Sequence, residues 1–116
     1  MKRFFLTAIL FFSIPASVFA AANPLSDLQS AIMQEDFKKA GELANGLLAR
    51  NLSRAERAEA QYYLGLSQLR QGDYAPAYDT FKKLIAERPA TEIYDKAYVG
   101  LIDSLLMQGS YEQALK

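Results

Sequence analysis

The segment Gln71-Gly72-Asp73-Tyr74-Ala75-Pro76-Ala77 occurs in related form three times in this 116-residue chain. Residues 34–40 read Gln-Glu-Asp-Phe-Lys-Lys-Ala and residues 108–114 read Gln-Gly-Ser-Tyr-Glu-Gln-Ala, each 37 positions from the central copy. Every copy has a glutamine, a turn residue, a residue suited to capping a helix, an aromatic residue and then an alanine. A fixed period of roughly 20 to 50 residues is typical of stacked helical repeats. The spacing therefore predicts an array of helical hairpins.

The N-terminal residues have the pattern of a secretory signal peptide. Lys2 and Arg3 precede an apolar run over residues 4–14, and small residues follow at positions 16–22. The run is about half of the roughly 20 apolar residues that a membrane-spanning helix needs. We expect cleavage after Ala20, or after Ala22, a domain over residues 21–116 and no membrane span after cleavage. The chain has no cysteine for a disulfide or for lipid attachment, which suits the bacterial periplasm.

Composition argues against several classes of function. Without Lys2 and Arg3, 11 of the 13 basic residues remain against 13 acidic residues, so no basic excess indicates nucleic acid binding. The chain has no histidine and no cysteine, which excludes Ser-His-Asp and Cys-His sites and zinc sites built on imidazole or thiolate. The carboxylates are scattered, mostly at expected helix starts, where they complement the helix dipole. We expect no enzymatic activity, no metal and no cofactor.

Six helices are expected from hydrophobic periodicity and capping signals. Asn23 starts the first, the Ser53-x-x-Glu56 capping box starts the third, and Gly72 ends the third in a left-handed turn. Gly109 is expected to end the fifth helix in the same way, with Ser110 capping a short sixth. The expected ranges are 23–34, 37–50, 53–71, 73–88, 91–108 and 110–116.

The middle of the chain resembles a tetratricopeptide repeat. Leu64, Gly65, Ala77, Phe81 and Pro89 stand at the spacing of the family's Leu-Gly, Ala-x3-Phe and Pro signature. The resemblance implies an all-α fold, a right-handed superhelical array of antiparallel helical hairpins with about two and a half repeats. The units span about 23–52, 53–90 and 91–116. The 37-residue period resembles that of bacterial envelope members of the family.

The resemblance also implies how the units pack. Gly65 and the alanines at 40, 77 and 114 allow close helix approach, while Phe81 fills the gap toward the next hairpin. In the third unit Ile102 replaces the glycine. Four tyrosines are expected to pack in the core, namely Tyr74, Tyr78, Tyr98 and Tyr111. Three arginines, Arg50, Arg54 and Arg57, are interpreted as part of a solvated turn.

The first helix of each unit is expected to line a concave groove. The implied partner-binding residues are Leu25, Gln29, Ile32, Met33, Tyr62, Leu66, Leu69, Arg70, Val99, Asp103, Leu106 and Met107. Such a groove is largely apolar, with polar groups only at Gln29, Arg70 and Asp103. The resemblance disfavours the clamp with which some family members hold a terminal carboxylate, because residues 25–33 contain no Lys, Arg or Asn. The groove suits a helical or hydrophobic peptide, or equally a neighbouring element of the same protein.

Two functions follow as hypotheses. The first is an exported non-catalytic scaffold that binds a protein or peptide partner in the bacterial envelope. The second is a structural or oligomerisation module, which includes self-association through the incomplete third unit. The counterpart of Phe81 in that unit would be residue 118, and stable arrays generally need about three repeats. We therefore expect a fragment of a longer array, or a partner that covers the C-terminal face.

Overall fold

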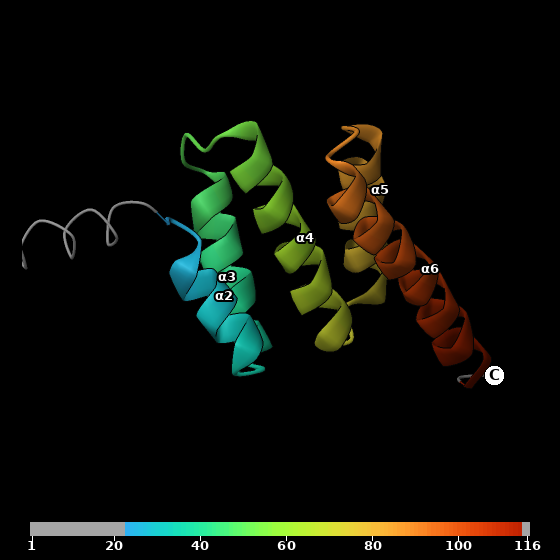
Figure 1. Ribbon diagram of the computed structural model, residues 1–116. Coiled ribbons are helices and arrows are strands. Elements are labelled where there is room, and N and C mark those ends of the chain that lie inside the picture. Colours follow the sequence, from blue (N-terminus) through green and yellow to red (C-terminus); the bar gives the residue numbers. More distant parts are fainter. Residues whose placement is uncertain (1–22, 115–116) are drawn as a thin grey trace, which may run out of the picture.

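A computed structural model describes residues 23–114, with side chains to residue 110, and the described part of the chain contains α-helices and no β-strand (Figure 1). The signal peptide prediction lies outside the described residues. The helices are α2 (Ser26–Met33), α3 (Phe37–Leu48), α4 (Arg54–Arg70), α5 (Tyr74–Ala86) and α6 (Thr91–Ala114). The all-α, tetratricopeptide-like fold is confirmed, whereas the handedness of a superhelix stays a prediction.

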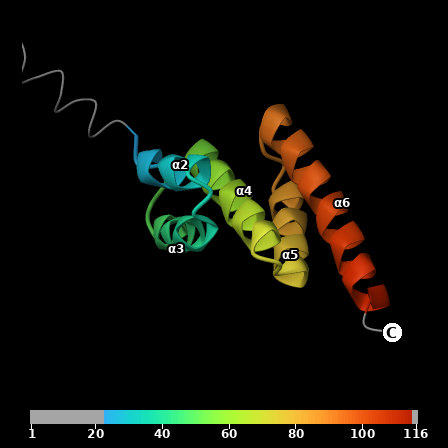
Figure 2. The same ribbon diagram turned by 90° about the horizontal axis from the view of Figure 1, so that it is seen from below.

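The helices form two layers. α4 contacts both α2 and α6 as well as its sequence neighbours α3 and α5, while the described lengths of α3 and α5 do not contact each other. Figure 2 shows α2, α4 and α6 following one another across the molecule, with α3 and α5 on one side of them. The first helix of each unit therefore belongs to one layer, and the second helices form the other.

The 37-residue period extends to buried positions. Ala40 and Ala77 are fully buried at equivalent places in the second helices. Ser67 and Ser104 are likewise fully buried, and each hydroxyl donates a hydrogen bond of 2.8 Å to the carbonyl four residues earlier. A buried hydroxyl needs such a partner, and the same local solution recurs in α4 and α6. The repeat is thus one of packing as well as of sequence.

Most helix starts agree with the capping signals. The Ser53 hydroxyl accepts from the Glu56 amide at 3.2 Å, and Glu56 Oε1 accepts from the Ser53 amide at 3.0 Å, which completes the predicted capping box. Asp73 occupies the N-cap position of α5 without a side-chain hydrogen bond to the helix. α2 begins at Ser26 rather than at Asn23, because Asn23 Oδ1 accepts from the Leu25 amide at 3.1 Å and stabilises a turn there.

Two equivalent turns use different residues. Gly72 has φ +86°, the Gly72 amide donates to the Leu69 carbonyl, and the Asp73 amide donates to the Gln68 carbonyl. This is a Schellman motif. At Glu35, 37 positions earlier, φ is 58°. The Glu35 amide donates to the Ile32 carbonyl and the Asp36 amide donates to the Ala31 carbonyl. A glutamate in this conformation is strained, because its Cβ approaches the following carbonyl oxygen.

Glu35→Gly is therefore expected to stabilise the fold by up to about 1 kcal/mol, since relief of the left-handed strain exceeds the extra entropy of glycine in the unfolded chain. Gly72→Ala is the matched control and should destabilise by a similar amount. Urea denaturation followed by circular dichroism measures both changes. A destabilised Glu35→Gly protein would show that the glutamate side chain contributes more than the strain costs.

The predicted break at Gly109 is wrong. α6 continues from Thr91 to Ala114 as one helix, so Ser110 does not cap a sixth helix. A single glycine inside a helix costs only about 1 kcal/mol relative to alanine, so the neighbouring helical hydrogen bonds can outweigh it. Gly109 is such a glycine, unlike Gly72, which adopts a positive φ and ends α4.

The core consists of two clusters, and at one pair of equivalent positions the large and the small residue are exchanged between the two helices. In the first cluster, Leu28 of α2 is buried with Ala44 of α3. In the second, the equivalent pair is Gly65 of α4 and Phe81 of α5. In the first unit the large residue is on the first helix and the small one on the second. In the second unit the small residue is on the first helix and the large one on the second. Interiors are close-packed, so the two sizes must change together.

Phe81 fills the space between three helices, as predicted. It is fully buried, and a Cβ added at Gly65 would lie 2.7 Å from its ring. On its other side, a Cβ added at Gly100 of α6 would lie 2.5 Å from the ring. The packing position of Tyr98 is a wrong prediction, because 48% of this residue is exposed. Tyr74 and Tyr78 are half-buried, and the side chain of Tyr111 lies outside the described residues.

Candidate protein-binding groove

A hollow opens between the N-terminal halves of α4 and α6, in the layer formed by the first helices. Its volume is about 280 Å³. Two tyrosines and three charged residues line it together with two aliphatic residues, namely Ala55, Glu59, Tyr62, Tyr63, Glu92, Ile93 and Lys96. The hollow therefore offers both aromatic surface and hydrogen-bonding groups to a bound chain.

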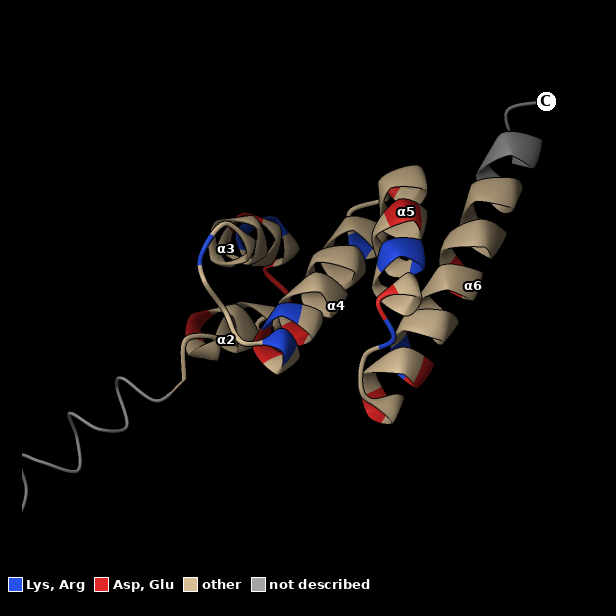
Figure 3. Cartoon of the chain, turned by 90° about the horizontal axis from the view of Figure 1, so that it is seen from above, with Lys and Arg blue, Asp and Glu red and all other residues tan. Residues whose placement is uncertain are grey.

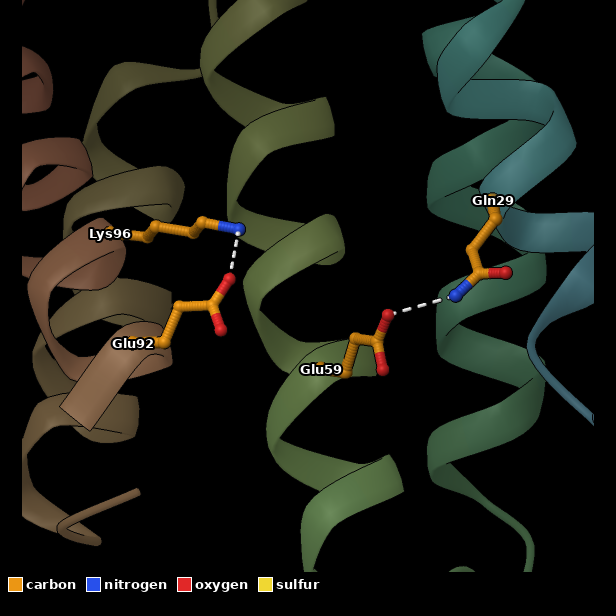
Figure 4. A network of polar contacts seen from close by, with 4 residues as sticks. All are labelled: Gln29, Glu59, Glu92 and Lys96. Carbon is orange, nitrogen blue, oxygen red and sulfur yellow. Dashed lines mark hydrogen bonds and ion pairs between the residues drawn. The ribbon is translucent and has the colours of Figure 1, made fainter. Parts of the chain in front are cut away.

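Charged side chains of α4 and α6 line this hollow, and one of them is also hydrogen-bonded to α2 (Figure 4). Gln29 Nε2 donates to Glu59 Oε1 at 2.9 Å and so connects α2 to α4. Lys96 Nζ and Glu92 Oε1, one turn apart on α6, form an ion pair at 3.2 Å. The pair is exposed, so its contribution to stability is small. Both side chains of the Lys96–Glu92 pair are exposed to solvent.

Tyr63 and Lys96 are the two titratable groups of the hollow whose pKa is shifted from its ordinary value. Burial raises the pKa of Tyr63 above the usual value for a phenol, and the carboxylate of Glu59 adds to this effect. Lys96 acts in the opposite direction. Its own pKa is raised by the hydrogen bond and charge of Glu92. The folded state therefore favours the neutral phenol and the charged amine.

Glu59→Gln is expected to lower the pKa of Tyr63, because the negative charge beside the phenol disappears. Because the folded-state pKa is raised, the phenol's contribution to stability is complete below the unfolded pKa of about 10 and is lost as the pH rises through the folded value. Ultraviolet titration at alkaline pH, with a Tyr63→Phe variant to assign the signal, measures the shift. An unchanged Tyr63 titration would contradict the proximity of the two groups.

Eleven of the twelve groove residues predicted from sequence lie on α2, α4 or α6, and Leu25 directly precedes α2. They differ in accessibility. Four of them are half-buried and remain partly accessible, namely Gln29, Tyr62, Leu66 and Leu69. Ile32 is half-buried against the first core cluster, and Leu25 is only 2% exposed within it. Exposed residues complete the set, namely Met33, Arg70, Val99, Asp103, Leu106 and Met107.

The hollow contains only Tyr62 from that predicted set. Sequence reasoning missed Glu59 and Lys96, which occupy the same position in successive units. A signal was present, because residue 59 lies three positions before Tyr62 and residues three apart share a helix face. The N-terminal end of the groove is therefore more polar than predicted.

A second hollow, of about 480 Å³, lies at the turn between α5 and α6, beside the start of α4. Two of the arginines that line it, Arg54 and Arg57, already have partners. Arg54 donates to the Glu87 carbonyl at 3.2 Å, and Arg57 donates to the Leu48 carbonyl at 3.2 Å. Both guanidinium groups thus satisfy carbonyls at helix C-termini. Their role is structural and more specific than the solvated turn that the sequence indicated.

Residues 59–91 match the family model described as tetratricopeptide repeat. The matched residues run from α4 through α5 to the first residue of α6. They include Gly65 and Phe81, whose contact closes the second core cluster. No curated protein and no solved structure matches the chain.

The fold is that of a helical-repeat protein, and the matched repeat suggests a protein-protein interaction scaffold. Residues 59–91 form a tetratricopeptide repeat within it. Such repeats are generally non-catalytic. Across residues 23–114, no helix combines the length and apolar character required to cross a membrane. The described residues also contain no group of three or more acidic, histidine or cysteine side chains that could hold a metal ion.

Proposed function

We propose that the protein is an exported, non-catalytic scaffold of the bacterial envelope that binds a helical or hydrophobic protein segment in the groove formed by α2, α4 and α6. The observation that carries the proposal is the tetratricopeptide repeat at residues 59–91, whose first helix contributes half-buried Tyr62 and Leu66 to the groove. The signal-like residues 1–22 support export.

The groove's chemistry supports a segment with mixed character. Apolar residues such as Leu66 and Val99 offer contact area to an apolar face. Glu59 and Lys96, at the N-terminal end of the groove, offer an acceptor and a donor for polar groups of the partner. The partner would therefore place its apolar face along α4 and α6 and its polar residues near the hollow.

Site-specific photocrosslinking in bacterial cells tests the binding surface. A photoreactive amino acid at position 66 or 99 should crosslink to an envelope protein, whereas the same amino acid at exposed position 82 on α5 should not. Equal crosslinking from all three positions, or none from the first two, would contradict groove binding. Fusing residues 1–22 to a reporter that is active only in the periplasm tests export separately.

A second candidate function is a self-associating structural module. It is favoured by the concentration of exposed large hydrophobic residues on one helix. Of the eight among the side chains described, seven lie on α6: Tyr94, Tyr98, Val99, Ile102, Leu105, Leu106 and Met107. Exposed patches of this kind mark interaction surfaces. Analytical ultracentrifugation decides this candidate, because a monomer at all concentrations contradicts self-association.

A further inference from the structure

One face of α6 is equivalent to faces that are covered in the other two units. In α4, α5 covers this face: Phe81 touches Gly65, and the Thr80 hydroxyl donates to Gln68 Oε1 at 2.7 Å. In α2, residues 28 and 31 occupy the same positions and are buried with α3. The corresponding residues of α6, Ile102 and Leu105, are 43% and 50% exposed.

The open face extends along α6 as a stripe, which we call the outer stripe: Tyr94, Tyr98, Ile102 and Leu105. These residues follow the helical spacing of four, four and three positions and therefore point to one side. The rings of Tyr94 and Tyr98 stack with centroids 6.2 Å apart. In Figure 3, α6 is mostly free of charge along its length beyond the first turns. The outer stripe is thus a continuous apolar surface.

The size rule of the core indicates what can cover it. Leu28 is accompanied by Ala44 in the covering helix, and Gly65 by Phe81. Ile102 occupies the position of Leu28 and Gly65 and is large. A helix packed on the outer stripe must therefore present a small residue opposite Ile102, as α3 does opposite Leu28. A large residue there would overpack the contact.

Charge indicates the same kind of partner and disfavours a second α6. Over Thr91–Ala114, Glu92, Asp95, Asp103 and Glu112 stand against Lys96, which makes the helix net −3. The two covering helices α3 and α5 are each net +1. Two copies of α6 would bring like charges together, whereas a basic helix would be attracted.

We propose that the outer stripe of α6 binds a lysine-bearing amphipathic helix of a partner protein, antiparallel to α6, with an alanine-x3-alanine-x2-leucine pattern on its apolar face. The orientation follows from α5, which runs antiparallel to α4 on the equivalent face. The second alanine lies against Ile102. This surface differs from the groove, so the failure of groove binding would leave the proposal standing, and the reverse.

A peptide of residues 36–50 serves as the probe, because Ala40, Ala44 and Leu47 give it the required pattern. A lactam between Lys38 and Glu42, one turn apart, holds it helical without altering that face. Fluorescence anisotropy with the purified full-length gene product measures its affinity. The Ala44→Phe peptide should bind about tenfold more weakly, because the larger side chain overpacks the contact with Ile102.

Ile102→Gly in the protein should reverse this preference, since it recreates the pairing of Gly65 with Phe81. The Ala44→Phe peptide should then bind more tightly than the original peptide. Glu42→Gln, an exposed change on α3 of the protein, is the matched control and should leave both affinities unchanged. Circular dichroism verifies that each variant is folded.

Three results would overturn the proposal. Wild-type protein that binds neither peptide, or binds both equally, lacks the size-selective surface. A preference that Ile102→Gly does not reverse places binding elsewhere. A dimer in ultracentrifugation that Leu105→Asp dissociates, combined with absence of peptide binding, identifies a second copy as the occupant.

Discussion

Phe81→Ala is expected to lower the free energy of unfolding by about 3 to 5 kcal/mol, the range for truncating a fully buried phenylalanine. The cost should lie toward the upper end, because the ring is flanked by Gly65 and Gly100. Neither glycine has a side chain that could move into the cavity. The loss would separate α5 from both α4 and α6, and a domain of this size has little stability to spare.

Urea denaturation followed by circular dichroism measures this loss. Phe37→Ala is the matched control, because Phe37 is the other phenylalanine within the described residues and is only half-buried. Its truncation should cost clearly less. If the two variants were equally destabilised, the ring of Phe81 would not be the central contact between the second and third units.

Gly100→Ala is expected to destabilise the fold by about 1 to 3 kcal/mol through overpacking, although alanine favours a helix over glycine by about 1 kcal/mol. The added Cβ would lie 2.5 to 2.8 Å from three atoms of the Phe81 ring, which is itself enclosed and cannot move away. Gly46→Ala in α3 is the control. Nothing lies within 4 Å of a Cβ at position 46, so this change should stabilise the helix by its propensity alone.

Differential scanning calorimetry distinguishes the two alanine variants by the sign of the change in Tm. A higher Tm for Gly100→Ala would show that α6 can shift away from Phe81 at little cost. The double variant Gly100→Ala, Phe81→Leu removes the clash from the other side and should be less destabilised than the sum of the two single changes.

The first unit also suggests two further substitutions that should compensate for the loss of the Phe81 ring. Its equivalents of Gly65, Phe81 and Gly100 are Leu28, Ala44 and Tyr63, which contribute to the first core cluster. The triple variant Gly65→Leu, Phe81→Ala, Gly100→Tyr copies that set into the second cluster. It should be more stable than Phe81→Ala alone, as judged by the urea midpoint. A triple variant no better than Phe81→Ala would show that the two clusters do not obey one size rule.

Local signals in the sequence predicted much of the fold. The capping box at Ser53, the left-handed turn at Gly72 and the burial of Phe81 depend on residues within one unit and on spacing along the chain. Each is confirmed. The continuation of α6 through Gly109 was not predictable in this way, because the local sequence at Gly109 resembles that at Gly72, and a single glycine can either end a helix or be tolerated inside one.

The candidate groove was less predictable for a related reason. Repeat spacing placed its residues on the correct layer but could not show that Leu25 is closed off in the core. Glu59 and Lys96 come together with Tyr63 only through the packing of α4 beside α6. Likewise, the contact of Phe81 with Gly100 crosses from one unit to the next, whereas the family signature describes positions within a unit.

The alternation of large and small residues between the two clusters also bears on how faithfully the chain folds. Identical repeats can dock one unit out of register and become trapped in misassembled states. Here α3 placed over α4 would set Ala44 against Gly65 and leave a void, while α5 placed over α2 would force Phe81 into Leu28. Each second helix thus fits only its own first helix, and the size exchange selects against the register error that a 37-residue period would otherwise permit.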